Sequence, residues 1–406
     1  GTTYYKFRGR LRDIEPVPGI LRERIARCAA VDWMEEAAEH QVRGVSLQVS
    51  QRSDQVFSAV LADITKQPAA TSIAVGKDTF TYALENLGGN RVSAASIFQD
   101  IAQSELGFIY VKGDTTQGET LVFEHRQSRA ANTTNSVSFD NDMLDLKVPR
   151  TLDNVFNRLE VVIYTRAVDA AATTVLFTLP QPQTASIAAG ASVTLWGDFR
   201  DPSQKATWVG GTAMVNPVAT TDYTMNTGAD GTGTDLTASF TVTPTFFASS
   251  VKLVVANTHA SLGGYITKLQ CRGKGVYRYD PATFRADATS SQTSYGLRPM
   301  TVPMPYQDSH LVAQGAADYL AIIYGTAAQQ VDAITFDANR SSTFLTAALA
   351  REISDRIGID ETVTGVTATA GGGAIRGWYI NAVEFEFGPA CVGRQITCSW
   401  GLSRGN

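Results

Sequence analysis

Charged residues are scarce in this sequence, and neither sign dominates. Of 406 residues, 18% are Asp, Glu, Lys or Arg, against a typical share of about 25%. The 34 Lys and Arg and the 39 Asp and Glu leave a net charge of −5. A dedicated nucleic-acid-binding surface needs a basic excess, so this balance argues against one. No apolar run reaches the length of about 18 residues that marks a bilayer-spanning helix.

Cysteine is also scarce, with four residues and no CxxC pair or Cys/His cluster at zinc spacing. Cys391 and Cys398 flank a predicted hairpin. They either pair with each other or, like Cys28 and Cys271, stay reduced in a protein assembled in the cytosol. No signal-peptide layout opens the chain, which begins with Gly rather than Met. We therefore expect a processed or truncated chain whose first domain lacks its opening strands.

The length predicts about two to four domains. Changes in pattern divide the chain into segments 1–78, 79–169, 170–268 and 269–406. The third is the most distinct, because positions 206–251 hold three charged residues, all Asp, among short apolar runs broken by turn residues. This pattern is typical of an inserted, immunoglobulin-like β-sandwich. The fold class we expect is mainly β, multidomain α+β, with β-barrel and β-sandwich domains and a few short packed helices.

Helices and hairpins are predicted from caps and periodicity. N-terminal caps at Ser53 or Asp54, Ser93, Asp308 or Ser309, and Ser341 or Ser342 each precede an apolar helical stripe. The second of these helices is expected to end at a C-terminal cap glycine, Gly107, and the last to end near Gly358. A short helix is also expected over residues 33–39. The expected strands lie at residues 5–13, 22–32, 42–49, 80–84, 108–112, 120–125, 154–166, 331–337, 378–387 and 395–402.

A search for enzyme motifs finds no GxSxG, HExxH, Walker P-loop or GxGxxG pattern. Glu384 and Glu386 share one side of a predicted strand at a spacing of about 6.5–7 Å, which a glycosidase could use. The alternative is the solvated face of an amphipathic strand. The four histidines lie in separate segments. Acidic groups at 140–145 and 230–235 are either calcium ligands or polar turns, and neither matches EF-hand spacing.

Two sets of residues stand out as candidate contacts. Four cations, Lys6, Arg8, Arg10 and Arg12, alternate along the first predicted strand and would line one side of it. They would meet phosphates or an acidic patch on a neighbouring subunit, or form a solvated face balanced by nearby acids. In the predicted sandwich, Trp196 and Trp208 are either sugar-stacking platforms or core residues.

Several runs of the sequence, over roughly three-quarters of the chain, resemble a family of minor tail proteins of tailed bacteriophages, the baseplate or tail-tip hub proteins. The runs are FRGRLRDIEP (7–16), AAVDWM (29–34), SIFQDIAQSELG (96–107), LVFEHR (121–126), YGLRP (295–299), ITFDANR (334–340) and ITCSWGL (396–402).

The resemblance implies a structural virion protein, assembled in the host cytoplasm, that closes the tail tube as a homotrimer. It implies tube-like barrels in segments 1–78 and 269–406 and a helix-and-hairpin hub domain between them. Its partners would be tail-tube and distal tail proteins, the tape-measure protein and tail-tip or fibre proteins, around a channel through which DNA passes without specific binding. No cofactor, metal or catalytic residue is implied. The alternatives are a host-polysaccharide adhesin, which would bind a surface glycan, and a depolymerase.

Overall fold

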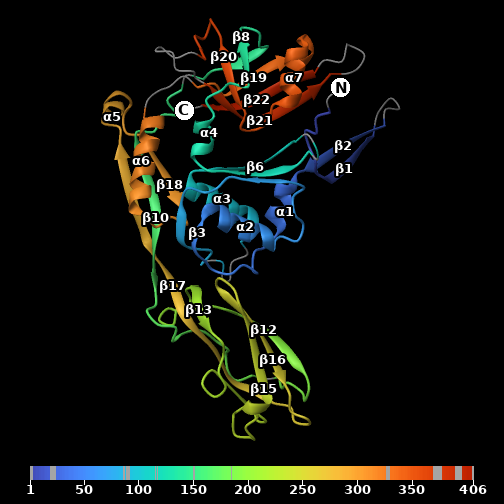
Figure 1. Ribbon diagram of the computed structural model, residues 1–406, viewed down its shortest axis with the longest axis vertical. Helices are drawn as coiled ribbons and strands as arrows, with labels where there is room; N and C mark the ends of the chain where they lie inside the picture. The colour runs from blue at the N-terminus through green and yellow to red at the C-terminus, as the bar shows by residue number, and fades with distance from the viewer. Residues whose placement is uncertain are drawn as a thin grey trace.

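Strands dominate this computed structural model, and they assemble around several separate hydrophobic cores (Figure 1). The structure describes residues 3–18, 24–85, 87, 92–114, 116, 118–149, 151–183, 185–325, 330–368, 377–388 and 396–404. The predicted class, a mainly β, multidomain α+β protein, is confirmed.

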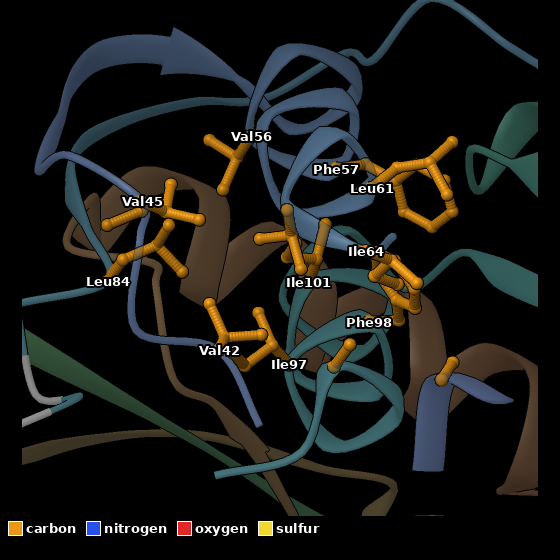
Figure 2. Packing of buried hydrophobic residues seen from close by; sticks show 14 of the residues in the cluster. Val42, Val45, Val56, Phe57, Leu61, Ile64, Leu84, Ile97, Phe98 and Ile101 are labelled. Carbon is orange, nitrogen blue, oxygen red and sulfur yellow. The ribbon is translucent and has the colours of Figure 1, made fainter. Parts of the chain in front are cut away.

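The first core joins residues from both of the first two sequence segments (Figure 2). Phe57 and Phe98 stack at its centre, with ring centroids 4.3 Å apart. Its elements are α1 (Trp33–Glu39), β3 (Gln48–Arg52), α2 (Ser53–Asp63), β4 (Thr71–Ile73), β5 (Thr79–Ala83), α3 (Ala94–Glu105), β6 (Phe108–Lys112) and β7 (Thr120–Glu124). Helices α2 and α3 bury their predicted apolar stripes here, and Ser93 caps α3 by accepting the Ser96 N–H.

A two-stranded ribbon extends from this unit, at the right edge of Figure 1. It consists of β1 (Arg10–Pro18) and antiparallel β2 (Arg24–Val31). The first strand was predicted over residues 5–13, but it begins at Arg10. Tyr5 instead forms an isolated bridge to Asp114.

The C-terminal core lies under a six-stranded sheet with strand order β8-β20-β21-β22-β19-β9. Its strands are β8 (Val137–Asp140), β9 (Asp145–Lys147), β19 (Ala333–Asp337), β20 (Arg356–Asp360), β21 (Trp378–Phe387) and β22 (Ile396–Arg404), and α7 (Ser342–Ala350) packs on it. The prediction that this last helix ends near Gly358 is wrong, because Gly358 lies inside β20. A Cβ there would fall 2.6 Å from Asn135 Nδ2 and 2.7 Å from Ser138 Oγ, so these two side chains would have to move to make room for one.

The sandwich core takes side chains from a three-stranded sheet, β12-β16-β15, and from strands paired with β17. The strands are β11 (Thr174–Thr178), β12 (Ser192–Asp198), β13 (Gly210–Val215), β14 (Tyr223–Asn226), β15 (Phe240–Phe246) and β16 (Ser250–Asn257). Strand β17 (Tyr265–Asp287) runs out of this lower lobe into the upper part of the molecule (Figure 1). It therefore passes through position 268, where the sequence pattern placed a boundary.

The last core forms where β10 (Arg158–Val168) pairs with β17 and β18 (Pro299–Met304), under helix α6 (His310–Tyr324). Ser309 caps α6 by accepting the Val312 N–H, as predicted. The remaining described elements are the short helices α4 (Gln127–Ala131) and α5 (Thr289–Tyr295) and the 3₁₀ turns η1 (Thr237–Ser239) and η2 (Ala338–Arg340).

Gly107 is not the left-handed residue at the end of α3. Leu106 takes that conformation, with φ 52°, and the Gly107 N–H donates to the Ala102 carbonyl at 2.7 Å. A Cβ on Gly107 would fall 2.3 Å from the Glu124 carbonyl oxygen. Glycine is therefore needed for the close approach to β7.

Candidate interaction surfaces

Lys6, Arg10 and Arg12, three of the four predicted basic residues, find acidic partners within the chain. Lys6 forms an ion pair with Glu352 and also donates to the Arg351 carbonyl at 2.7 Å. Arg8 is exposed just before β1. The four cations therefore do not lie on one strand, since β1 begins only at Arg10. Their contact with a neighbouring subunit stays a prediction.

The acidic face of α1 binds the base of the ribbon. Arg10 lies 2.7 Å from a Glu39 oxygen and 3.4 Å from a Glu36 oxygen, and Arg12 lies 3.0 Å from Glu35. The hydrogen bond from Arg10 lowers the pKa of the Glu39 carboxyl. Each exposed pair is weak by itself, but together they fix which face of the ribbon turns toward α1.

The ribbon is amphipathic because of a β-bulge at Arg12. The register pairs Leu11 with Ala30 and then Asp13 with Ala29, so one residue of β1 is left over. The shift brings Leu11 and Ile14, three residues apart, to the same face. Residues on that face are Leu11, Ile14, Pro16, Ala26, Cys28 and Ala30, and all of them are exposed.

We call this surface the apolar ribbon face. Leu11 is 60% exposed and Ile14 56%. The opposite face carries the charged residues Arg10, Asp13, Glu15 and Arg27 together with Ala29 and Val31. A two-stranded ribbon is at best marginally stable in water unless it packs against something, and an uncovered apolar face on it marks an interaction surface.

Neither tryptophan of the sandwich lies in its core, so the core interpretation of both is wrong. Trp196, on β12, is 55% exposed, and Trp208 is 37% exposed. Trp196 stacks on Phe247 with ring centroids 5.6 Å apart, and Lys252 lies 6.0 Å from its ring centroid. The Arg200 guanidinium lies 4.2 Å from the Trp208 ring centroid. Both indoles are thus available to a partner, and sequence alternation in β12 (Thr194, Trp196) was the signal that could have placed Trp196 outward.

A cleft of about 640 Å³ lies between α3, α6 and β21, where three units meet. Phe108, Met300, Leu320 and Tyr379 line its apolar part. Arg129 stacks on Phe108 with the guanidinium 3.7 Å from the ring centroid.

The two arginines at this cleft are already paired. Arg129 donates to Glu124 at 3.3 Å and to Asn381 at 3.0 Å, and Arg126 forms a bidentate pair with Asp78. An anionic ligand would have to displace these carboxylates. The bond from Arg129 to Asn381, on β21, joins the C-terminal sheet to the first unit, whereas Arg126 and Asp78 pair within the first unit.

The carboxylates considered for chemistry lie in ordinary structural settings. Glu384 and Glu386 are exposed on β21, while Val383 and Phe385 pack against the C-terminal core, as an amphipathic strand requires. The Asp142 carboxylate accepts the Asp140 N–H, and Asp230 and Asp235 accept N–H groups two residues further along, which are polar turns.

Within the described ranges, no group of three or more His, Cys, Asp or Glu side chains is arranged to hold a metal ion. No helix in those ranges has both the length and the apolarity to cross a membrane. His40 lies 3.1 Å from Asp63; His310 lies in α6, and the other three histidines lie in separate connecting segments. Cys398 is buried with a free thiol, and Cys391 lies outside the described residues, as does most of the turn at 388–393.

No protein-family model matches the chain, and no curated protein matches it. Among solved structures, the 43 kDa tail protein of prophage MuSo2 from Shewanella oneidensis is similar over 98% of this chain and 88% of that one, with 10% identity and a TM-score of 0.44. The tail protein from Neisseria meningitidis MC58 is similar over 98% of this chain and 80% of that one, with 9% identity and a TM-score of 0.47. At these identities and TM-scores the likeness does not by itself assign a function.

Proposed function

We propose that this protein is a structural component of a phage tail, a tail-tip or baseplate hub that assembles as a homotrimer. In this role it closes the tail tube around the channel for the tape-measure protein and the DNA. Its other partners are tail-tube, distal tail and fibre proteins, and it is located in the virion. It has no catalytic role.

The observation that carries the proposal is the apolar ribbon face. Leu11 and Ile14 are exposed, while Arg10, on the other face, and the bulge residue Arg12 form ion pairs with α1. An exposed apolar surface of this kind is typical of a protein–protein interface, so we expect another subunit to cover it. The seven sequence runs that resemble hub proteins support the same role. The weakly acidic net charge of −5 suits a channel that DNA must pass without binding.

The experiment that tests it is the mass of the purified protein by light scattering over a wide concentration range, with averaged electron micrographs. A trimer with a central hole supports the hub. A particle that stays a monomer at every concentration up to the highest soluble one contradicts it.

A second candidate function is glycan binding by the sandwich lobe. It is favoured by the exposed Trp196 indole beside Phe247 and Lys252, since flat sugar faces stack on open aromatic rings. A glycan array probed with the whole protein and with Trp196→Ala tests it. Binding that is lost in Trp196→Ala but kept in Thr194→Ala, a neighbour on the same sheet face, supports this function; equal signals from all three proteins contradict it. A depolymerase would instead release sugar fragments from bacterial polysaccharide.

A further inference from the structure

Strand β21 has an edge that is paired along only part of its length. β22 pairs with one side of it from Trp378 to Phe387, but on the other side β20 pairs only with Trp378 and Tyr379. Within the described ranges, no strand is hydrogen-bonded to residues 381–387 on this second side, which we call the free edge of β21. It contains no proline, so its outward backbone N–H and C=O groups are a template for a further strand.

Strand β2 supplies a second open edge. In the described part of the chain it pairs only with β1, and residues 26–30 are all exposed. Bulges and prolines are the usual protection of a sheet edge, and β1 has both, a bulge at Arg12 and prolines at Pro16 and Pro18. β2 has neither. The ribbon projects at the right edge of Figure 1, so its unprotected strand is within reach of a neighbouring chain.

The free edge of β21 has an acidic face and an apolar face. Glu384 and Glu386 are exposed on one face, and the free edge has no Lys or Arg. On the other face, Val383 and Phe385 pack against the C-terminal core, whereas Phe387 stacks on Phe385 but is 71% exposed. The apolar face is therefore incomplete at its outer end, where Phe387 is left largely uncovered.

Strand β2 has the complementary pair of faces. It contains two Arg and no Asp or Glu, and Arg27 lies on its charged face, opposite Glu15 of β1. Ala26, Cys28 and Ala30 lie on the apolar ribbon face, where their small side chains allow a close approach. The two edges thus match in backbone hydrogen bonding, in charge on one face and in apolar character on the other.

We infer that β2 of one copy pairs with the free edge of β21 of the next copy, so that the ribbon extends the neighbour's C-terminal sheet. The inference rests on the proposed function, because it names the contact that would join the subunits of the ring. In such a sheet Arg27 lies on the same face as Glu384 and Glu386 of the neighbour. The apolar ribbon face then continues the core side of the sheet and covers Phe387.

A second copy is the occupant that the charges favour. Among the described residues, Arg27, Glu384 and Glu386 form no ion pair. Two copies of β2 side by side would bring arginines together, and two copies of β21 would bring glutamates together, so each edge favours the other. Within one copy, the ion pairs of Arg10 and Arg12 with α1 hold the base of the ribbon to the first unit. One edge of each kind per chain gives head-to-tail contacts, which close into a ring when the rotation allows it.

Cross-linking between copies tests the contact directly. Cys28 is exposed on the apolar ribbon face, and Phe387 is exposed on the side of β21 that this face would continue. In a Cys391→Ser background, Phe387→Cys is treated with a short bis-maleimide reagent and run on a denaturing gel. We expect linked dimers and trimers that disappear when Cys28→Ser is added. The control is Val363→Cys, at a position 91% exposed in the turn after β20, which should give no such ladder.

An exchange of charges measures the contribution of the contact to assembly. Arg27→Glu places an acid beside Glu384 and Glu386, so the trimer should dissociate at a concentration about ten times higher. Adding Glu384→Lys and Glu386→Lys to Arg27→Glu should restore assembly, because opposite charges then face each other again. Lys205→Glu, a change of the same size at an exposed position of the sandwich lobe, should leave assembly unchanged. Circular dichroism checks that all variants keep the parent's secondary structure.

The outcomes separate this inference from the proposed function. A native trimer in which Cys28 is never linked to Phe387→Cys of another copy, and which Arg27→Glu leaves unchanged, overturns the inference and leaves the hub in place. A loss of assembly in Arg27→Glu that Glu384→Lys and Glu386→Lys do not restore also overturns it. A protein that is a monomer throughout, with no link between copies, overturns both.

Discussion

Arg166 and Glu85 form an ion pair that is almost completely buried, with 2.8 Å between the Arg166 Nη2 and Glu85 Oε1 atoms and side chains only 1% and 2% exposed. Arg166 also donates to the carbonyls of Tyr164 at 2.8 Å and Pro305 at 2.6 Å. Glu85 belongs to the first unit and Arg166 to β10. The two residues are 81 positions apart in the sequence. Their ion pair therefore connects the first core with the core under α6.

Removing one partner of this pair should be far more damaging than removing both. Arg166→Met leaves the Glu85 carboxylate buried without its counter-ion, and we expect a loss of about 3–5 kcal/mol in the free energy of unfolding. Arg166→Met combined with Glu85→Leu should recover much of that loss. Urea unfolding of the single and double variants measures it. As a control, Glu35→Gln breaks only the exposed pair with Arg12 and should cost less than about 1 kcal/mol. If Arg166→Met, the double variant and Glu35→Gln all lower the free energy of unfolding equally, the buried pair contributes no more than an exposed one.

Gly210, on β13, packs on the backbone of the same Glu85. A Cβ added at Gly210 would lie 2.7 Å from Glu85 Cβ and 3.1 Å from its Cα. Neither atom is the flexible end of a side chain, so Gly210→Ala should destabilise the protein by about 1–3 kcal/mol. Gly263→Ala is the matched control, because its nearest neighbour would be 3.4 Å away, an ordinary contact. Thermal unfolding of both variants tests the difference, and a Gly210→Ala protein as stable as Gly263→Ala would refute it.

The stacked rings at the centre of the first core should carry much of its stability. Phe98 is fully buried and stacks on Phe57. We expect Phe98→Ala to cost about 3–5 kcal/mol, because it leaves a cavity that the helices cannot fill. Val363→Ala, at a 91% exposed position, should change stability by less than about 0.5 kcal/mol. Guanidinium unfolding followed by circular dichroism provides the comparison.

Asp287 should stabilise the junction of β17 with β10 in a pH-dependent way. Its carboxylate accepts hydrogen bonds from Arg158, Gln292 and Arg285, and the bond from Arg158 is the main cause that lowers its pKa to about 2. The unfolded chain has the ordinary value of about 3.9. The folded state therefore holds the charged form more tightly, and this stabilisation is complete above about pH 4 and is lost as the pH falls toward 2.

The unfolding midpoints of the parent and Asp287→Asn test this. The difference between them should be constant from pH 7 to pH 5 and should shrink below pH 4. The carboxylate is partly exposed, so 0.5 M salt should reduce the difference as well. A difference that grows as the pH falls would contradict the assignment.

Two thiols should be unreactive while the protein is folded. Cys271 and Cys398 are buried, and burial raises the pKa of each thiol to about 12. In a Cys28→Ser, Cys391→Ser background at pH 8, a disulfide reagent such as DTNB should find no fast thiol. In guanidinium it should find two, because the thiol pKa returns to its ordinary value. One rapid equivalent before unfolding would contradict the burial of one of these side chains.

Local signals in the sequence were enough to find most helices and several strands. Helix α1 was predicted over the residues it occupies, and Ser93 and Ser309 mark the starts of α3 and α6. Caps and helical stripes act within one or two turns, so neighbouring residues carry the whole signal. The hairpin of β6 and β7 was also predicted, because two strand patterns joined by turn residues are likewise a signal between near neighbours.

Local sequence patterns did not predict the surfaces proposed for assembly. Strict alternation put Leu11 and Arg12 on opposite faces of a strand that was expected to start at residue 5. The bulge at Arg12, which brings Leu11 and Ile14 together, exists only because of the pairing with β2. The outward direction of Trp196 likewise depends on which side of β12 the other sheet covers.

The sequence alone therefore determined the mainly β class, the caps of α3 and α6, and the contrast between the sandwich segment and the rest, because these depend on composition and on near neighbours. The cap of α2, predicted at Ser53 or Asp54, is Arg52. Only the tertiary structure decided that segments far apart share cores, that Glu85 meets Arg166, and that Leu311 and Ile322 stay exposed. Those facts depend on long-range strand pairing and burial, which no local pattern encodes.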